Sequence, residues 1–238
     1  MTPPSGPAAR GAARGLPPPG RLPVAVAMGA STGGPQALKA VLRGLPADLP
    51  GYVFVVQHIH PRFTTMLARR LGEVSSLAVA EARDGEVPRL GSAYVAPGGG
   101  HLEVVGGAAR RGPVMRVVDA PPRHGVRPCA DVLFASLAEC FGPRTVAVIL
   151  TGMGQDGLEG CRAVNARGGM VLAEAPETCT VFGMPRAPID EGVVDRVVPI
   201  GDMAAAIAEA VERLGRPGEA PRRRIARRLA ALSRSMVG

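Results

Sequence analysis

The chain has 238 residues, of which 46% are hydrophobic, and a formal net charge of +8. Its length suits one large α/β domain or two small ones. No apolar run approaches the roughly 18 residues of a membrane span, and the amino terminus lacks the apolar block of a secretory signal, so we expect no integral membrane segment.

The positive charge is concentrated at the two ends of the chain. Residues 1–21 carry three arginines and no acid, and residues 216–238 carry seven arginines and one glutamate, which leaves residues 22–215 with a net charge of −1. A body without a basic face argues against nucleic-acid binding. We therefore expect a disordered Pro/Ala/Arg-rich lead-in at 1–21, a folded domain at 22–215 and a basic tail at 216–238.

Short apolar runs alternate with helical patterns along the folded domain. The predicted strands are 24–28, 52–57, 77–80, 93–96, 114–118, 145–150, 170–173 and 193–199. The predicted helices are 36–43, 64–71, 130–140, 158–166 and 203–214. This alternation predicts a doubly wound α/β fold, with a mainly parallel sheet and helices on both faces. The stretch from about 84 to 118 instead indicates short strands joined by glycine turns, which predicts a short antiparallel edge.

The first predicted strand runs into the segment MGASTGG at residues 28–34. The first N–H groups of a helix have no partners within it, so such a turn can hold a phosphate or present a serine for attack on a carbonyl. Nucleotide binding is disfavoured, because the turn lacks the middle glycine of G-x-G-x-x-G and no phosphate-gripping lysine follows.

Three chemically useful side chains come at the ends of predicted strands: Ser31, His58 and Asp156. Working sites of open α/β sheets lie beyond the carboxyl ends of the strands. A serine needs a base, and the base needs an orienting carboxylate, so these residues can form a catalytic triad. Backbone N–H groups near Thr32 and Met153 can bind the developing oxyanion. Taken singly, the same three side chains also suit helix caps and a structural histidine.

A metal site is the rival interpretation of the histidines. His58 and His60 have the i, i+2 spacing of two ligands, and His101 and His124 are possible distant ligands. The cysteines offer no such pattern, since they are widely spaced without a C-x-x-C pair, and we expect reduced thiols in a cytoplasmic protein. They are Cys129, Cys140, Cys161 and Cys179.

The basic tail places Ile225, Leu229 and Leu232 at i, i+4 and i+7 among arginines. This pattern suits a basic amphipathic helix for an acidic membrane or protein surface. A solvated tail is the alternative.

Six segments resemble, in order, the catalytic domain of the chemotaxis protein-glutamate methylesterases, the CheB family. They are GASTGGPQAL, VVQHIHPRFT, YVAPGGGHLEV, RPCADVLFASLA, ILTGMGQDGLEG and TCTVFGMPRAPID, and the resemblance runs from about residue 24 to 200. It implies a triad of Ser31, His58 and Asp156, with Thr32 and Met153 lining the site. It also makes 22–215 the methylesterase catalytic domain and implies a doubly wound fold.

The activity implied by this resemblance is hydrolysis of glutamate γ-methyl esters on the cytoplasmic helices of methylated chemoreceptors, in chemotaxis adaptation. An acyl-enzyme releases methanol, some relatives also deamidate glutamine, and no cofactor or metal is needed. A serine esterase or amidase of this fold with another substrate, or a non-catalytic signalling module, remains an alternative.

The sequence also departs from the family pattern. Only about twenty residues precede the catalytic domain, where relatives usually have a phosphorylatable receiver domain, so we expect a stand-alone enzyme. His60 replaces the usual proline before Pro61, which can perturb the charge of His58.

Overall fold

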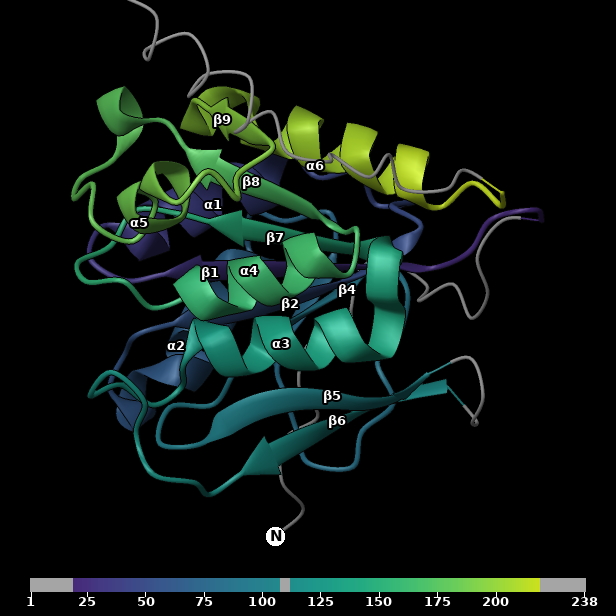
Figure 1. Ribbon diagram of the computed structural model, residues 1–238. Helices are drawn as coiled ribbons and strands as arrows, with labels where there is room; N and C mark the ends of the chain where they lie inside the picture. The colour runs from purple at the N-terminus through teal and green to yellow at the C-terminus, as the bar shows by residue number, and fades with distance from the viewer. Residues whose placement is uncertain (1–18, 108–111, 219–238) are drawn as a thin grey trace, which may run out of the picture.

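The computed structural model describes residues 19–107 and 112–218, so most of the predicted lead-in and basic tail lies outside the described residues. Seven parallel strands form the main sheet in the order β3-β4-β2-β1-β7-β8-β9 (Figure 1). They are β1 Val24–Ala30, β2 Gly51–Gln57, β3 Ala78–Glu81, β4 Ser92–Val95, β7 Thr145–Ile149, β8 Met170–Glu174 and β9 Arg196–Val198.

The central strands are apolar along their whole length because the sheet is covered on both faces. Every residue of β1 and of β7 is buried, which explains why their sequences show continuous apolar runs rather than alternation. From β1 the chain continues to β2 on one side, and from β7 it continues to β8 on the other. The order of the strands therefore switches between β1 and β7, which is where ligands bind in such sheets.

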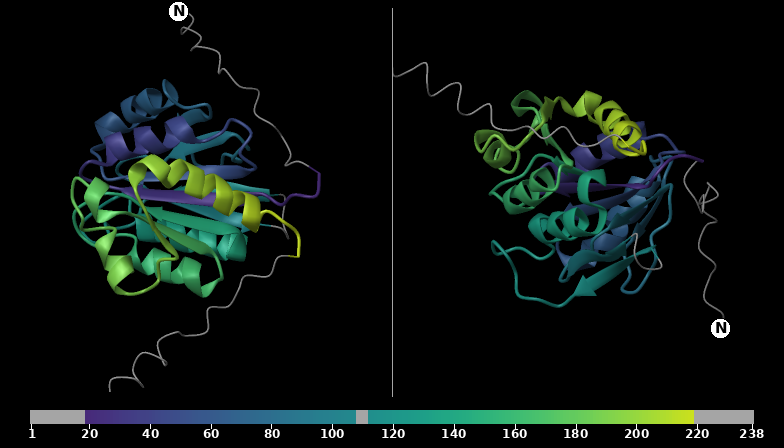
Figure 2. Two further views of the ribbon diagram at one scale, coloured as in Figure 1. Left: turned by 90° about the horizontal axis from the view of Figure 1, so that it is seen from above. Right: turned by 45° about the vertical axis from the view of Figure 1, so that its right-hand side comes forward.

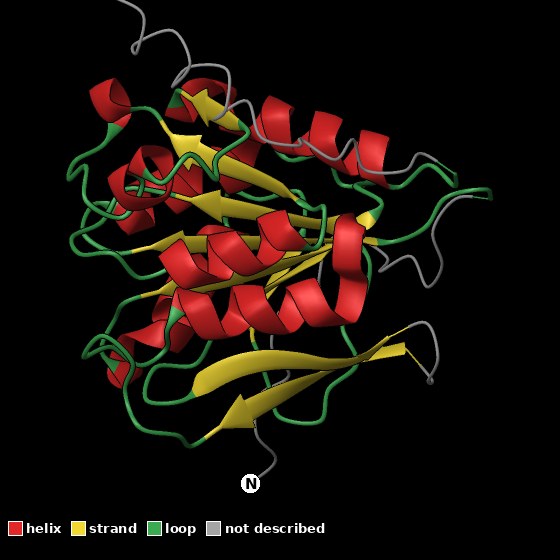
Figure 3. Ribbon diagram, in the orientation of Figure 1, coloured by secondary structure: helices red, strands yellow, loops and turns green. Residues whose placement is uncertain are grey.

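Helices form a layer on each face (Figures 2 and 3). One layer packs with Val26 and Val148, and the other packs with Ala27 and Ile149. The first contains α1 Gly34–Gly44, α2 Thr64–Gly72 and α6 Ile200–Leu214, and the second contains α3 Ala130–Phe141 and α4 Leu158–Ala166. The predicted parallel α/β fold is confirmed.

The stretch from 84 to 118 does contain an antiparallel pair, but the pair does not extend the main sheet, and the predicted strand 93–96 is instead the parallel strand β4 of that sheet. β5 His101–Gly107 and β6 Gly112–Val118 pair with each other as a separate two-stranded sheet. This hairpin lies beside α3 (Figure 1), and its Leu102 and Met115 belong to the same core as Phe54 of β2. Both edges of the main sheet are instead the parallel strands β3 and β9.

The sequence patterns did not resolve the seven-residue strand β5 or the short helical elements. The helix α5 Arg186–Asp190 was not predicted, and neither were three single turns of 3-10 helix, η1 Pro61–Phe63, η2 Gly142–Arg144 and η3 Pro176–Thr178. Within the described residues, no helix combines the length and the apolar character needed to cross a bilayer.

Candidate active site

The three predicted catalytic side chains lie at neighbouring strand ends. Ser31 directly follows β1, His58 directly follows β2, and Asp156 lies between β7 and α4. Because β2 and β7 flank β1, their carboxyl ends meet at one edge of the sheet, to the left in Figure 1. The backbone continues the pairing past the strands, since the Ser31 N–H donates to the carbonyl of Thr151 over 3.0 Å and the His58 N–H donates to that of Ala30 over 3.1 Å.

His58 and Asp156 form a short side-chain contact. Nε2 of His58 lies 2.6 Å from Oδ2 of Asp156, and the two side chains are 13% and 3% exposed. Ser31 is half-buried. Gly152 packs closely against it, since a Cβ added to Gly152 would lie 2.8 Å from the Cβ of Ser31. The described residues contain no hydrogen bond from the Ser31 hydroxyl to His58. The structure thus places all three groups at one edge of the sheet and joins two of them directly.

Asp156 is held by the start of α3. Its Oδ2 accepts the Ala130 N–H over 2.7 Å, and its Oδ1 accepts the Asp131 N–H over 3.1 Å and the Cys129 thiol over 2.9 Å. Burial alone raises the pKa of Asp156, but the hydrogen bonds from His58, the thiol and these two N–H groups outweigh it, so that the pKa is lowered. The carboxylate is therefore ionised at neutral pH.

The donors on Asp156 were missed by the sequence reasoning, although they lie in the quoted segment RPCAD. The predicted start of a helix at residue 130 was the indication available in the sequence, because N–H groups at the start of a helix are free to bind an anion. What the sequence did not show is that α3 reaches the loop after β7. Gly29 permits this approach, since a Cβ there would lie only 2.9 Å from that of Ala130.

Gln57 joins the segments that carry the serine and the histidine. Its side chain is buried, and Nε2 donates to the carbonyl of Ser31 over 2.9 Å and to that of His58 over 3.0 Å. A lone polar residue at the end of the apolar run YVFVV was the signal for such a role. Gln57 therefore connects the backbone after β1 to the backbone after β2.

Thr151 and Glu174 brace the nucleophile turn from the other side. The Thr151 hydroxyl donates to the carbonyl of Thr32 over 3.0 Å, and Oε2 of buried Glu174 accepts the Thr151 N–H over 2.8 Å. Burial raises the pKa of Glu174, although the hydrogen bonds from Thr151 and Thr178 act in the opposite direction. Both residues were missed, and each is a polar residue in or just after a buried strand.

The two predicted oxyanion residues flank this arrangement. Thr32 follows Ser31 in the turn, and Met153 follows Gly152, which packs on Ser31. The Met153 side chain is 76% exposed. Within the described residues neither the Thr32 N–H nor the Met153 N–H donates to another group, so both are free to bind an incoming oxygen.

The histidines named as rival metal ligands have separate partners. The His60 ring accepts the N–H of Arg62 over 3.3 Å, buried His101 contacts the carbonyl of Pro121 over 3.1 Å, and His124 contacts Asp131. The polar atoms of His124, Asp131 and Asp156 do lie within 4.8 Å of one another. However, both carboxylates also accept backbone N–H groups, which favour an anion and oppose a cation at the same place.

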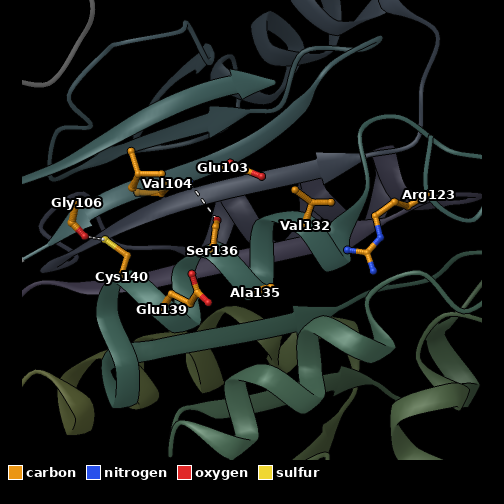
Figure 4. Close-up of a pocket in the computed structure, with 10 residues that line it drawn as sticks. Glu103, Val104, Gly106, Arg123, Val132, Ala135, Ser136, Glu139 and Cys140 are labelled. Atoms are coloured by element: carbon orange, nitrogen blue, oxygen red, sulfur yellow. Dashed lines mark hydrogen bonds between the residues drawn. The ribbon is translucent and has the colours of Figure 1, made fainter. Parts of the chain in front are cut away.

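A pocket of about 390 Å³ lies between β5 and α3 (Figure 4). No triad residue lines it. Its walls are tied together by the Val104 N–H, which donates to the Ser136 hydroxyl over 3.0 Å, and by the Cys140 thiol, which donates to the carbonyl of Gly106 over 2.8 Å. The pocket therefore lies in the interface between the β5–β6 hairpin and α3, which these hydrogen bonds hold together.

Comparison with known proteins identifies close relatives. Residues 26–207 match the model of the CheB methylesterase family. A protein-glutamate methylesterase/protein-glutamine glutaminase of Geobacillus kaustophilus is 51% identical over 78% of this chain and 53% of its own length. The corresponding protein 1 of Myxococcus xanthus is 45% identical over 82% of this chain and 56% of its own length. This chain thus spans about half the length of the curated relatives it matches.

A crystal structure shares the fold over most of the chain. The Thermotoga maritima CheB methylesterase catalytic domain matches with a TM-score of 0.76 and 41% sequence identity. The match covers 79% of this chain and 98% of that domain.

Proposed function

Because this chain belongs to the CheB methylesterase family, we propose that it hydrolyses glutamate γ-methyl esters on chemoreceptors with Ser31 as nucleophile. The observation that carries the proposal is the 2.6 Å contact between His58 and Asp156 at strand ends on either side of Ser31. It supplies a base and an orienting carboxylate next to a hydroxyl that a glycine-rich turn presents.

The contact also supports a choice of the nitrogen of His58 that acts as the base. Asp156 is ionised, so Nε2 carries the proton that it donates to Oδ2, and Nδ1 is left with its lone pair. Nδ1 then takes the proton of the Ser31 hydroxyl as the hydroxyl oxygen attacks the ester carbonyl. Asp156 stabilises the imidazolium that forms.

The tetrahedral intermediate carries a negative oxygen beside the nucleophile. The free N–H groups of Thr32 and Met153 are our candidates for binding it, and one such donor contributes about 3 kcal/mol in known hydrolases. His58 returns its proton to the leaving methoxy oxygen, which departs as methanol and leaves an acyl-enzyme. Water activated by His58 then frees the glutamate and restores Ser31. A glutamine side chain would release ammonia by the same steps, which is our proposal for a second activity.

The proposed partners are methylated chemoreceptor cytoplasmic helices, which places the reaction in the cytoplasm. All four cysteines are free, as that compartment requires: Cys129, Cys140, Cys161 and Cys179. The net charge of the basic tail, with seven arginines and one glutamate in residues 216–238, suits contact with an acidic receptor or membrane surface.

Methanol release from a methylated chemoreceptor tests the proposal. We expect release by the wild type and a loss of about 10³-fold or more in Ser31→Ala, because the nucleophile is gone. Ser76→Ala is the matched control. Ser76 is exposed and lies before the amino end of the outer strand β3, whereas the proposed triad lies at the carboxyl ends of the central strands. This variant should keep full activity.

Other outcomes would point elsewhere. A folded wild type that cleaves a small ester but not the receptor would indicate a different substrate, and no cleavage of either would indicate a signalling module. Equal release by the wild type and Ser31→Ala would rule out the serine mechanism.

A further inference from the structure

A second histidine–carboxylate pair, His124 and Asp131, lies next to the pair formed by His58 and Asp156. Nε2 of His124 is 2.9 Å from Oδ2 of Asp131, which is buried, while the His124 side chain is 46% exposed. The other oxygen of Asp131 accepts the Gly160 N–H of α4 over 2.7 Å. The proposed reaction uses neither His124 nor the carboxylate of Asp131.

The two pairs are in contact through the backbone. The N–H of Asp131 donates to Oδ1 of Asp156 over 3.1 Å, and polar atoms of His124, Asp131 and Asp156 lie within 4.8 Å of one another. Two buried carboxylates are therefore neighbours, and each has a histidine of its own: His58 for Asp156 and His124 for Asp131.

Neighbouring carboxylates repel each other when both are ionised, and each then raises the pKa of the other. Burial is the main cause that raises the pKa of Asp131, and the charge of Asp156 adds to it, while the Gly160 N–H and His124 lower it. A protonated His124 therefore offsets negative charge next to the carboxylate of Asp156.

Two buried thiols lie near the pair, and two charged side chains, Arg123 and Glu159, adjoin His124 and Gly160 in the chain. Burial raises the pKa of Cys129, which precedes α3, to about 12, and raises the pKa of Cys161 in α4 well above its usual value. Both are uncharged at neutral pH. The charge that His58 experiences from this side thus depends on Asp156, Asp131 and His124.

We propose that His124 and Asp131 are positioning residues, which set the charge beside Asp156 and thereby the basicity of His58. Asp131 in its ionised form adds negative charge and strengthens the base, and His124 in its protonated form limits that effect. Their role in catalysis rests on the proposed function, but their effect on the titration of His58 does not.

The direct test is the titration of the His58 ring, followed by NMR. The chain has four histidines, and His58→Gln identifies the signal. Asp131→Asn removes a negative charge, so we expect the His58 pKa to fall by about half a pH unit or more. His124→Gln keeps a hydrogen-bond donor for Asp131 but cannot carry a positive charge, so the His58 pKa should rise. The double variant should return toward the wild type, because both charges are gone.

If Asp131 and His124 had only structural roles, the two substitutions would not shift the His58 pKa in opposite directions. Glu209→Gln is the matched control. Glu209 lies on α6, on the other face of the sheet, where it is exposed and forms an ion pair with Arg196. This substitution should leave the His58 pKa unchanged. Shifts in the same direction, or none in His124→Gln, would overturn the proposal. Should Asp131→Asn fail to fold, His124→Gln alone decides.

Kinetics then separate this inference from the proposed function. The acid limb of kcat/KM for methyl-ester hydrolysis requires neutral His58, so it should move to lower pH in Asp131→Asn and to higher pH in His124→Gln, with KM unchanged. Opposite NMR shifts in a protein that releases no methanol would support the charge coupling and reject the methylesterase.

Discussion

At the scale of single residues, the site depends on how Asp156 is kept ionised in a buried position. A buried carboxylate ordinarily becomes neutral, and a neutral Asp156 would not hold the proton of His58 on Nε2. Two backbone N–H groups, a thiol and the imidazole all donate to it. The start of α3 thus helps to keep Asp156 ionised, because its N–H groups and the Cys129 thiol lower the pKa of that carboxyl.

Cys129 gives the sharpest residue-scale prediction. Because burial and the charge of Asp156 raise its pKa to about 12, it stays a thiol and donates to Oδ1. Cys129→Ala removes that donor, and we expect kcat to fall about 3- to 10-fold with KM unchanged, as for a hydrogen bond of about 1 kcal/mol. Cys129→Ser restores a donor and should recover most of the rate in a methanol-release assay.

The control is Cys161→Ala, another buried thiol, which has no hydrogen-bond partner among the described residues. It should lower stability without lowering kcat. A Cys129→Ala enzyme with the rate of the wild type would show that the N–H groups suffice to hold Asp156.

The sequence pointed to the three residues of the proposed triad because serine, histidine and aspartate each follow an apolar run that is easy to recognise. It did not locate Gln57, Thr151, Glu174 or the donors of α3, since their roles arise from contacts between segments that are 23 to 119 residues apart. Polar residues inside buried strands were the available signal. Their hydrogen-bond partners depend on strand order and helix docking, which periodicity does not contain.

At the scale of elements, apolar patterns predicted the five long helices and most of the strands but not β5, and α4 has the predicted bounds of 158–166. The hairpin was misplaced because alternation and glycine turns indicate antiparallel pairing but not which sheet a strand joins. α5 was missed because five residues that include a proline carry too little periodicity to indicate a helix.

The contact between α3 and α4 gives the element-scale prediction. Gly160 lets the helices approach, since a Cβ there would lie 2.5 Å from Cβ of Phe134 and 3.1 Å from Cα of Asp131. Neither atom can swing away. Gly160→Ala should lower the free energy of unfolding by about 1–2 kcal/mol, because overpacking exceeds the gain in helix propensity. Urea unfolding measures the change.

Gly201→Ala in α6 is the matched control for that substitution. A Cβ at Gly201 meets nothing within 4 Å, so it should leave stability unchanged or raise it by up to about 1 kcal/mol. Equal effects of the two substitutions would mean that α3 and α4 can separate at no cost.

At the scale of the whole molecule, the charge is divided between a nearly neutral domain and basic ends. Residues 22–215 have a net charge of −1, and residues 219–238 alone contain six arginines and one glutamate. A site that acts on receptors next to a membrane gains from such a tail, because each arginine close to an anionic surface contributes about 1 kcal/mol of attraction.

Truncation after Gly218 tests this use of the tail. On methylated receptor in anionic vesicles, we expect the KM of the truncated chain to be several-fold higher than that of the full chain at low salt. The difference should shrink as salt is raised, because at 0.1 M the Debye length is only about 10 Å. On a water-soluble receptor fragment that carries no net negative charge, the two chains should share one KM, and kcat should be equal throughout because no triad residue is altered. Equal KM values on the vesicles at every salt concentration would mean that the arginines serve only as a solvated tail.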